Sequence, residues 1–316
     1  MQTRKLGWTD LELTTVGFGA WAIGGGDWQF GWGDQDDDIS IKAIHKALDE
    51  GINWIDTAAV YGCGHSERVV GKALKQTRHR PFVATKCGRV CDEQKRISSW
   101  IKPESIRREL EASLRNLQLD TIDLYQIHWP DPDEDIEDAW HAMAEFIKEG
   151  KIRYAGVSNF NIAQLERIQA IHPVASLQPP YSMLRRDVET ELLDYCAQHQ
   201  IGVVVYSPMQ KGLLTGKVTR ERMKDLPAND YRSNDPWFKE PLLSKHLNIV
   251  DKLRPIAERN NITLAQLAIA WVLRRSGVTS AIVGTRKPEQ IVETAKAGDM
   301  ELSYADVNEI YTILTS

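Results

Sequence analysis

Short apolar runs alternate along this chain with longer stretches of helical periodicity, and this alternation constrains the fold more than any other feature. Most of the runs are brief and continuously apolar, which is typical of parallel strands buried on both faces. Eight such runs lie at residues 15–18, 54–55, 82–84, 122–127, 154–157, 176–177, 203–205 and 281–283. A succession of strand–helix units predicts a parallel sheet of the α/β class.

Such a sheet can have one of two architectures: a closed (β/α)8 barrel or an open, doubly wound sheet. Eight units in a chain of 316 residues match the usual size of the barrel. We therefore expect a (β/α)8 TIM barrel that forms a single domain over residues 1–316.

The boundaries of several helices can also be predicted. Pro103 stands at a first-turn position of one expected helix, and Thr263 is followed by Gln266 with the spacing of a capping box. Gly51 and Gly150 are expected to end helices just before the next strand.

Three segments fall outside the repeating pattern. Leu6 and residues 11–13, on either side of a turn at residues 7–10, predict an N-terminal β-hairpin that plugs the lower mouth of the barrel. The polar, proline-containing stretch 214–248 is expected to be a long loop on the active face. Residues 303–314 predict an extra C-terminal helix.

Composition and charge exclude several classes of protein. Hydrophobic residues make up 42% of the chain, too many for intrinsic disorder. Lys and Arg number 39 against 44 Asp and Glu, a net charge of −5, so we expect no nucleic acid partner. We expect no membrane partner either, because no apolar run is long enough to cross a bilayer.

The first residues lack the apolar stretch of a signal peptide, so we expect a cytoplasmic protein. Separately, we expect a monomer or weak homo-oligomer. The four cysteines are too few for a disulfide scaffold. Cys87 and Cys91 flank a loop next to Lys86, and Cys63 lies close to Tyr61, so a redox role is a further hypothesis.

Polar side chains follow the apolar strands at the points where the strands end. The carboxyl ends of the strands build the active site of a barrel, so these residues should converge on one rim. Taken singly, each has an ordinary explanation as a cap, a solvated charge or a packing residue. The strand-end residues are Asp56, Lys86, His128, Ser158, Asn159, Gln178 and Tyr206.

Four of the residues near this rim suit the reduction of a carbonyl. Tyr61 follows Asp56 by five residues, so the same loop can return its hydroxyl over the mouth. An ammonium beside a phenol lowers the pKa of the phenol, and a carboxylate holds the ammonium in place. A neutral imidazole from His128 can donate to the carbonyl oxygen. No side chain supplies a hydride, so a nicotinamide cofactor is implied.

Two other classes of function remain open. Lys86 could act as the nucleophile of a Schiff-base lyase or aldolase in the same barrel, and the chain could be a cofactor-binding regulatory subunit. A Rossmann site is not indicated, because the glycines at 17, 19 and 24–26 lack its spacing. No cluster of ligands predicts a metal site.

Several long motifs resemble those of the aldo-keto reductase superfamily. Their sequences are most similar to its bacterial and plant branch, which is related to the potassium-channel β-subunits. The motifs are GINWIDTA at 51–58, DLYQIH at 123–128, GKIRYAGVSNF at 150–160 and IVGTRKP at 282–288. The resemblance implies that Tyr61 donates the proton, that Lys86 lowers its pKa, that Asp56 pairs with Lys86 and that His128 orients the carbonyl.

The same resemblance implies a cofactor site that runs along the rim. Its residues are Ala20, Trp21, Asp56, Ser158, Asn159, Gln178, Tyr206, Ser207, Pro208, Met209, Lys211, Gly212, Leu213, Gly284, Thr285, Arg286, Gln290, Glu293 and Thr294. The expected substrate is a small-molecule carbonyl compound, and the expected substrate pocket is walled by Trp21, Trp28, Trp32 and Trp129.

The last strand end favours NADP(H) over NAD(H). Arg286 can grip a 2′-phosphate or stack on the adenine, and the backbone N–H groups at the following helix start are expected to be free for a phosphate. Gln290 and Thr294 depart from the residues often found in the family at these positions, where Arg and Asn are common.

Overall fold

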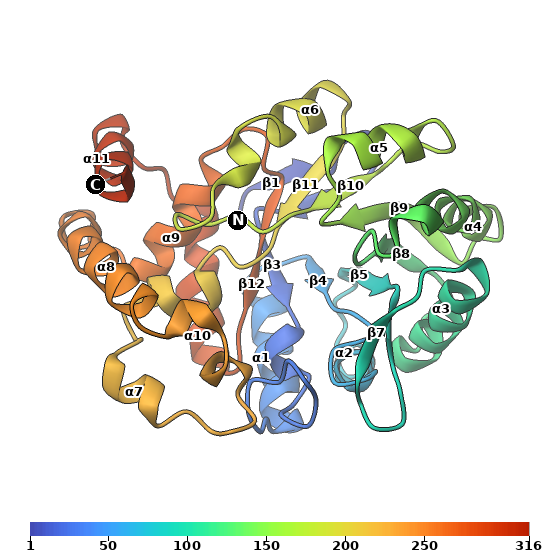
Figure 1. The fold of residues 1–316 in the computed structure, drawn as a ribbon, viewed down its shortest axis with the longest axis horizontal. Helices are drawn as coiled ribbons and strands as arrows, with labels where there is room; N and C mark the ends of the chain where they lie inside the picture. The colour runs from blue at the N-terminus through green and yellow to red at the C-terminus, as the bar shows by residue number, and fades with distance from the viewer. Residues whose placement is uncertain (316) are drawn as a thin grey trace.

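The computed structural model describes residues 1–315, and its centre is a closed barrel of eight parallel strands (Figure 1). Going round the barrel the order is β10-β11-β12-β3-β4-β5-β8-β9, so chain order is kept and the circle closes between β9 and β10. The strands are β3 (Val16–Gly19), β4 (Trp54–Asp56), β5 (Phe82–Cys87), β8 (Ile122–Ile127), β9 (Ile152–Ser158), β10 (Ser176–Gln178), β11 (Gly202–Val205) and β12 (Ser280–Gly284). The predicted (β/α)8 barrel is confirmed.

Helices surround the barrel and cover it with their apolar faces. They are α1 (Asp37–Asp49), α2 (His65–Lys75), α3 (Pro103–Leu117), α4 (Ile136–Lys148), α5 (Ile162–Gln169), α6 (Leu192–Gln198), α7 (Arg220–Lys224), α8 (Leu242–Arg259), α9 (Leu264–Leu273), α10 (Pro288–Ala295) and α11 (Tyr304–Thr315). Short 3-10 segments are η1 (Trp21–Ile23), η2 (Asp133–Asp135), η3 (Asp187–Glu189), η4 (Gln210–Thr215), η5 (Tyr231–Ser233), η6 (Pro236–Phe238) and η7 (Lys296–Asp299).

The predicted helix boundaries agree with the structure. Pro103 begins α3, and Thr263 and Gln266 form the capping box of α9. Gly51 and Gly150 have φ angles of +88° and +72°, which a residue without Cβ adopts at little cost. The predicted C-terminal helix is α11, and residue 316, the last of the predicted domain, lies outside the described residues.

The N-terminal hairpin is present. β1 (Thr3–Lys5) pairs antiparallel with β2 (Glu12–Thr14). Leu6, Leu11 and Leu13 are buried in a cluster with barrel residues that include Trp54 and Val204. The apolar side of the hairpin therefore plugs the end of the barrel opposite the strand-end rim.

The predicted long loop ends earlier than expected. Residues 214–248 contain α7, η5 and η6, and α8 begins at Leu242, so the last part of the predicted loop is helical. The reason is apolar spacing, since Leu243, Val250, Leu253 and Ile256 fall on the buried face of one helix.

A second hairpin was not predicted. β6 (Arg89–Cys91) pairs antiparallel with β7 (Ile97–Ser99) just after Lys86 and stands outside the barrel. A disulfide joins Cys91 to Cys63 in the loop after β4, whereas Cys87 and Cys196 are free and buried. The sequence predicted that the chain has too few cysteines for a disulfide scaffold, and it did not predict this single disulfide.

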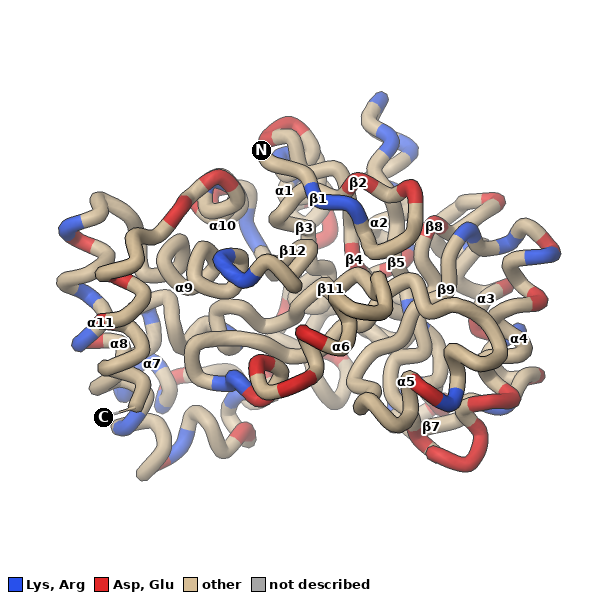
Figure 2. Tube along the Cα trace, turned by 90° about the horizontal axis from the view of Figure 1, so that it is seen from above, with Lys and Arg blue, Asp and Glu red and all other residues tan. Residues whose placement is uncertain are grey.

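Charged residues are distributed over the outside of the barrel. Acidic and basic residues are interspersed along the outer helices and loops (Figure 2). Among residues 1–315 no helix is both long and apolar enough to cross a membrane.

Close packing inside the barrel generates a prediction about Gly17 on β3. A Cβ at this position would overlap the indole ring of Trp54, which is held by hydrogen bonds from its Nε1 to Ser280 Oγ (3.1 Å) and Thr14 O (3.2 Å). Gly17→Ala should therefore lower the free energy of unfolding by about 1–3 kcal/mol in chemical denaturation. At Gly277 the nearest atom would be Leu193 Cβ at an ordinary 3.5 Å, so Gly277→Ala is the matched control. Equal stability of the two variants would contradict this packing.

Candidate active site

A cavity of about 900 Å³ opens at the carboxyl ends of the strands. This volume is at the upper end for small-molecule and cofactor sites. Each barrel strand delivers its last residues to one rim, so residues far apart in the sequence meet there, as predicted. The strand-end residues in the cavity wall include Asp56, His128, Ser158, Asn159, Gln178, Tyr206 and Gly284.

A buried ion pair lies beneath one end of the cavity. Lys86 Nζ donates to Asp56 Oδ1 at 2.6 Å and to the carbonyl oxygen of Thr57 at 2.8 Å. The side chains of Lys86 and Asp56 are 0% and 3% exposed. Lys86 Nζ also lies 3.4 Å from the hydroxyl of Tyr61, so the ammonium touches the phenol from below.

The pKa of Tyr61 is shifted in the direction opposite to the predicted one. Burial raises the pKa of the Tyr61 phenol well above its usual value, and the negative charge of Asp56 raises it further. The predicted net lowering is therefore wrong for this structure. The Lys86 ammonium opposes the increase because it favours phenolate. Tyr61 holds its proton at neutral pH, which is the state that a proton donor needs.

His128 faces the same end of the cavity. Its ring packs edge-on against Tyr61 with 5.8 Å between centroids. Burial and the charges of Lys86 and Arg89 lower the pKa of His128 well below 6.5. The imidazole is therefore neutral, as predicted. Its Nδ1 is buried without a hydrogen-bond partner.

Polar side chains at the carboxyl ends of β9, β10 and β11 form one connected network. Tyr206 Oη donates to Asn159 Oδ1 at 2.9 Å, and Asn159 Nδ2 donates to Ser158 Oγ at 2.9 Å. Gln178 Nε2 donates to Asp56 Oδ2 at 2.9 Å, which ties the network to the ion pair. The predicted nicotinamide-end residues are therefore brought together around Asp56.

The segment after β11 has an unusual backbone. Ser207, Gln210 and Lys211 have φ angles of +55°, +45° and +56°, and Gly212 has +97°. Such successions can turn backbone N–H groups toward an anion. Lys211 Nζ pairs with Asp235 Oδ2 at 2.8 Å and lies in the same wall of the cavity.

The last strand end is only partly as predicted. Gln290 Oε1 accepts from the backbone N–H groups of Arg286 (2.9 Å) and Lys287 (3.0 Å), so the predicted free N–H groups are already satisfied. The amide side chain of Gln290 is long enough to fold back over the helix start. Thr285, Arg286, Gln290, Glu293 and Thr294 do line the cavity.

Two loops close over the rim, residues 24–35 and 226–235, which we call the rim loops. Tyr231 N donates to Gly31 O at 2.9 Å, and Gly33 N donates to Asn229 O at 3.2 Å. The guanidinium of Arg286 donates to Trp32 O and Gln35 Oε1, each at 2.7 Å, so it holds the first rim loop.

Aromatic rings form part of the cavity wall. Trp21, Trp28, Trp32 and Trp129 all line the cavity, as predicted. Trp28 lies 6.0 Å from Tyr61 between ring centroids. Tyr231 was not singled out and packs against Trp21 at 5.2 Å.

A few residues fall differently from the prediction. Ala20 and Leu213 are fully buried, and with Lys86 they are not among the cavity-lining residues. Sequence reasoning missed cavity residues that lie in loops and in short elements outside the barrel, where no long periodicity marks them. They include Phe30, Arg89, Ile97, Arg185, Lys217, Arg222, Tyr231 and Arg232.

Comparison with known proteins agrees with this geometry. The family model described as "Aldo/keto reductase family" matches residues 15–315. The chain belongs to the aldo/keto reductase family. Enzymes of this family are oxidoreductases that use nicotinamide cofactors, and small carbonyl compounds fit them as substrates.

Three similar proteins span nearly the whole reductase. Aldo-keto reductase YhdN of Bacillus subtilis (strain 168) is 38% identical, over 99% of this chain and 94% of the relative. The NADH-specific methylglyoxal reductase of Escherichia coli (strain K12) is 38% identical, over 97% of this chain and 96% of its own. The solved glycerol dehydrogenase AKR11B4 from Gluconobacter oxydans has a TM-score of 0.89 and 39% identity, covering 99% of this chain and 95% of that one.

The residues of this reductase fit a nicotinamide cofactor. Amide side chains, the Tyr206 ring, Arg286 and most of the positive-φ segment 207–212 line one and the same cavity. Within residues 1–315 there is no cluster of His, Cys, Asp and Glu that could hold a metal.

The ion pair generates a prediction about stability. Lys86→Met should leave Asp56 as an unpaired buried carboxylate and lower the free energy of unfolding by about 3–5 kcal/mol. Denaturant unfolding of the variant, with exposed Lys42→Met as the control, measures this loss. If Lys86→Met unfolded like the control, the pair would not be buried as described.

The neutral imidazole of His128 generates a prediction about how stability depends on pH. The unfolded chain takes up a proton on this histidine near pH 6.5, whereas the folded chain does so only at lower pH. The free energy of unfolding should therefore fall as pH drops below about 6.5, and it should fall less in His128→Asn. Denaturation curves between about pH 5 and 7.5 test this, and parallel curves for both proteins would show that the folded imidazole titrates normally.

Proposed function

We propose that this reductase converts aldehydes or ketones to alcohols with NADPH, and that Tyr61 is the general acid. The observation that carries the proposal is the position of the Tyr61 hydroxyl. It lies at the cavity wall beside the neutral His128 ring and 3.4 Å above the ammonium of the buried Lys86–Asp56 pair. Bound NADPH would supply the hydride.

The chain's own residues account for the proton. His128, as a neutral imidazole, can donate a hydrogen bond to a carbonyl oxygen beside Tyr61. The Tyr61 hydroxyl then gives its proton to that oxygen as negative charge develops. The Lys86 ammonium stabilises the phenolate that remains, and Asp56 keeps the ammonium in place.

The same geometry argues against a Schiff-base lysine. Lys86 Nζ has three hydrogen-bond partners, Asp56, Thr57 and Tyr61, and its side chain is 0% exposed. An ammonium has three donors and no acceptor, so no lone pair faces the cavity.

The cofactor residues are proposed as follows. Ser158, Asn159 and Gln178 would hold the carboxamide, with the Tyr206 ring against the nicotinamide. The segment 207–213 would face the pyrophosphate, and Gly284 to Thr294 would face the adenosine. The proposal of NADPH is supported by three basic side chains at that end, Lys217, Arg222 and Arg286. The nearby carboxylate of Glu293 lies 3.5 Å from Lys217.

The setting of the enzyme follows from the same observations. We propose a single-domain cytoplasmic enzyme over residues 1–316, a monomer or weak homo-oligomer acting on small carbonyl compounds. The net charge of −5 and the mixed surface charge support the absence of a nucleic acid partner.

The role of Tyr61 generates a prediction about turnover. Tyr61→Phe should keep its fold and its affinity for NADPH but lose about 10²–10⁴-fold in carbonyl reduction, because a positioned acid contributes that much. Initial rates of NADPH oxidation with a panel of aldehydes measure it, with Tyr304→Phe as the control at an exposed tyrosine. Retention of more than about a tenth of wild-type turnover, with chemistry rate-limiting, would remove Tyr61 as the donor.

The choice of cofactor generates a prediction about Arg286. A charge-assisted contact is worth about 1.5–3 kcal/mol, so Arg286→Ala should weaken NADPH binding about ten- to a hundredfold and leave NADH nearly unchanged. Fluorescence titration gives both dissociation constants, and exposed Lys287→Ala is the neighbouring control. Equal losses for both cofactors would mean that Arg286 only holds the first rim loop.

A further inference from the structure

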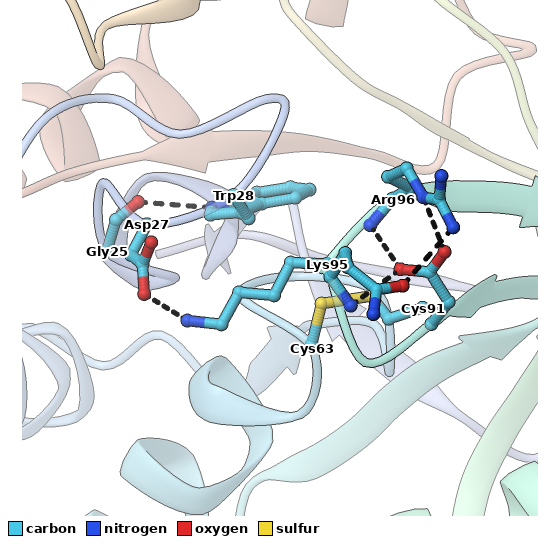
Figure 3. The surroundings of a disulfide bond; sticks show 9 residues. Gly25, Asp27, Trp28, Cys63, Cys91, Lys95 and Arg96 are labelled. Carbon is cyan, nitrogen blue, oxygen red and sulfur yellow. Dashed lines mark hydrogen bonds and ion pairs between the residues drawn. A yellow bond between two sulfur atoms is a disulfide. The ribbon is translucent and has the colours of Figure 1, made fainter.

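The disulfide between Cys63 and Cys91 joins two parts of the active site that are otherwise separate. Cys63 lies two residues after Tyr61, and Cys91 ends β6 of the hairpin β6–β7. The two cysteines are 28 residues apart in sequence, with Cα atoms 5.8 Å apart, within the usual range for a disulfide. Figure 3 shows the bond between the loop and the hairpin, next to Trp28 and Lys95.

Apart from the disulfide, side-chain contacts hold the hairpin over the barrel, including Ser99 Oγ, which donates to Asp131, and Arg89, which lies over the ring of Trp129. The hairpin is a separate two-stranded sheet, and such ribbons are marginally stable alone. Its tip, residues 92–96, is exposed. At the tip, Lys95 pairs with Asp27 of the first rim loop, but these side chains are 45% and 92% exposed, so the pair contributes little. At the base, Arg89 lies 3.7 Å from Asp131.

The same hairpin forms part of the substrate wall. Arg89 and Ile97 line the cavity. Cys91 and Ile97 pack, together with Tyr61, against the buried cluster that contains Trp28 and Val60. A change in the position of the hairpin therefore changes the wall that faces the catalytic tyrosine.

The loop on the other side of the disulfide is fixed independently. Tyr61 N donates to Ala58 O at 3.1 Å, Cys63 N donates to Val60 O at 3.0 Å, and Gly64 N donates to Ala59 O at 2.7 Å. The position of Tyr61 over Lys86 therefore does not depend on the disulfide alone.

Cys63 and Cys91 are both half-buried residues. The free cysteines Cys87 and Cys196 are buried and have raised thiol pKa values, because burial disfavours the thiolate. Disulfides in cytosolic proteins are rare, and those that occur are usually catalytic or redox-sensing. The proposed cytoplasmic setting therefore favours a reversible disulfide rather than a permanent structural one.

We propose that the Cys63–Cys91 pair is a redox switch on substrate recognition, which rests on the carbonyl reductase activity proposed above. The disulfide holds β6–β7 against the Tyr61 loop as a wall for large, apolar carbonyl compounds. A dithiol opens it by thiol–disulfide exchange: its thiolate attacks one cysteine sulfur, which forms a mixed disulfide and releases the other cysteine as a thiolate. The second thiol of the dithiol then closes its own disulfide and releases the cysteine that was attacked. The dithiol becomes a disulfide, and Cys63 and Cys91 each gain one electron and one proton.

The expected change is in substrate affinity rather than in chemistry. Loss of an apolar contact in a pocket lowers discrimination by roughly tenfold or more, so the KM for benzaldehyde should rise about tenfold on reduction. The KM for acetaldehyde, which is too small to reach the wall, should change little. The kcat for both aldehydes should stay within about twofold, because Tyr61, Lys86 and His128 remain in place.

The experiment compares the full-length protein before and after treatment with dithiothreitol, the double variant Cys63→Ser/Cys91→Ser, and Cys196→Ala as the control at a buried free cysteine. Peptide mapping follows the bond, and hydrogen exchange follows residues 89–99 and α2. In both the reduced protein and the double variant, we expect faster hydrogen exchange in the hairpin but not in α2. In both, we also expect a higher KM for benzaldehyde and a nearly unchanged KM for acetaldehyde. The control should behave like the oxidised wild type before treatment and like the reduced wild type after it.

Three results would overturn the proposal: no Cys63–Cys91 peptide after mild oxidation, unchanged exchange on reduction, or faster exchange with unchanged KM values. If the double variant does not fold, the reduced wild type still decides between these outcomes. Failure of the proposed function looks different, because no aldehyde would then be reduced in either state, while peptide mapping and hydrogen exchange would still report the bond and the movement of the hairpin.

Discussion

The buried pair of Lys86 and Asp56 is the interaction on which the rest of the site depends. The two charges lie 2.6 Å apart with almost no exposure to water. Such a pair is stable only if its remaining donors and acceptors are satisfied. Thr57 O, Gln178 Nε2 and Tyr61 Oη supply those partners. The need to satisfy the pair therefore draws one further strand end, that of β10, and the loop after β4 into a single arrangement.

This arrangement explains how one rim can serve two ends of a long cavity. At the substrate end, the ion pair supports Tyr61 beside a neutral His128. Toward the cofactor end, Asp56 accepts from Gln178, and Ser158, Asn159 and Tyr206 continue the network. The rim loops then cover the cavity, and Arg286 fastens the first of them. The barrel strands hold the strand-end side chains in fixed positions, and the loops cover the cavity and form its walls.

Much of the fold and of the candidate site was predictable, because the signals are local in sequence. Each proposed catalytic residue follows an apolar strand directly or within five residues, and parallel strands must end on the same rim. The pairing of Lys86 with Asp56 follows from the cost of burying a lone charge.

Other features depend on contacts that no local pattern encodes. The hairpin of Arg89–Cys91 and Ile97–Ser99 has no hydrophobic period, and the partner of Cys63 lies 28 residues away. Gln290 was considered only as a replacement for Arg, yet its side chain folds back over the backbone N–H groups expected to be free. The direction of the Tyr61 pKa shift depends first on burial and then on the charge of Asp56, and the burial is set by residues from many parts of the chain.

The central claim is that the Lys86 ammonium stabilises the phenolate of Tyr61 from within the barrel. The most direct test is NMR titration of the Tyr61 ring carbon, in protein labelled at the Cζ of tyrosine, compared between wild type and Lys86→Met. The account predicts that the phenol titrates at a clearly higher pH in Lys86→Met, because the stabilising charge is gone. The same or a lower pKa in Lys86→Met would contradict it.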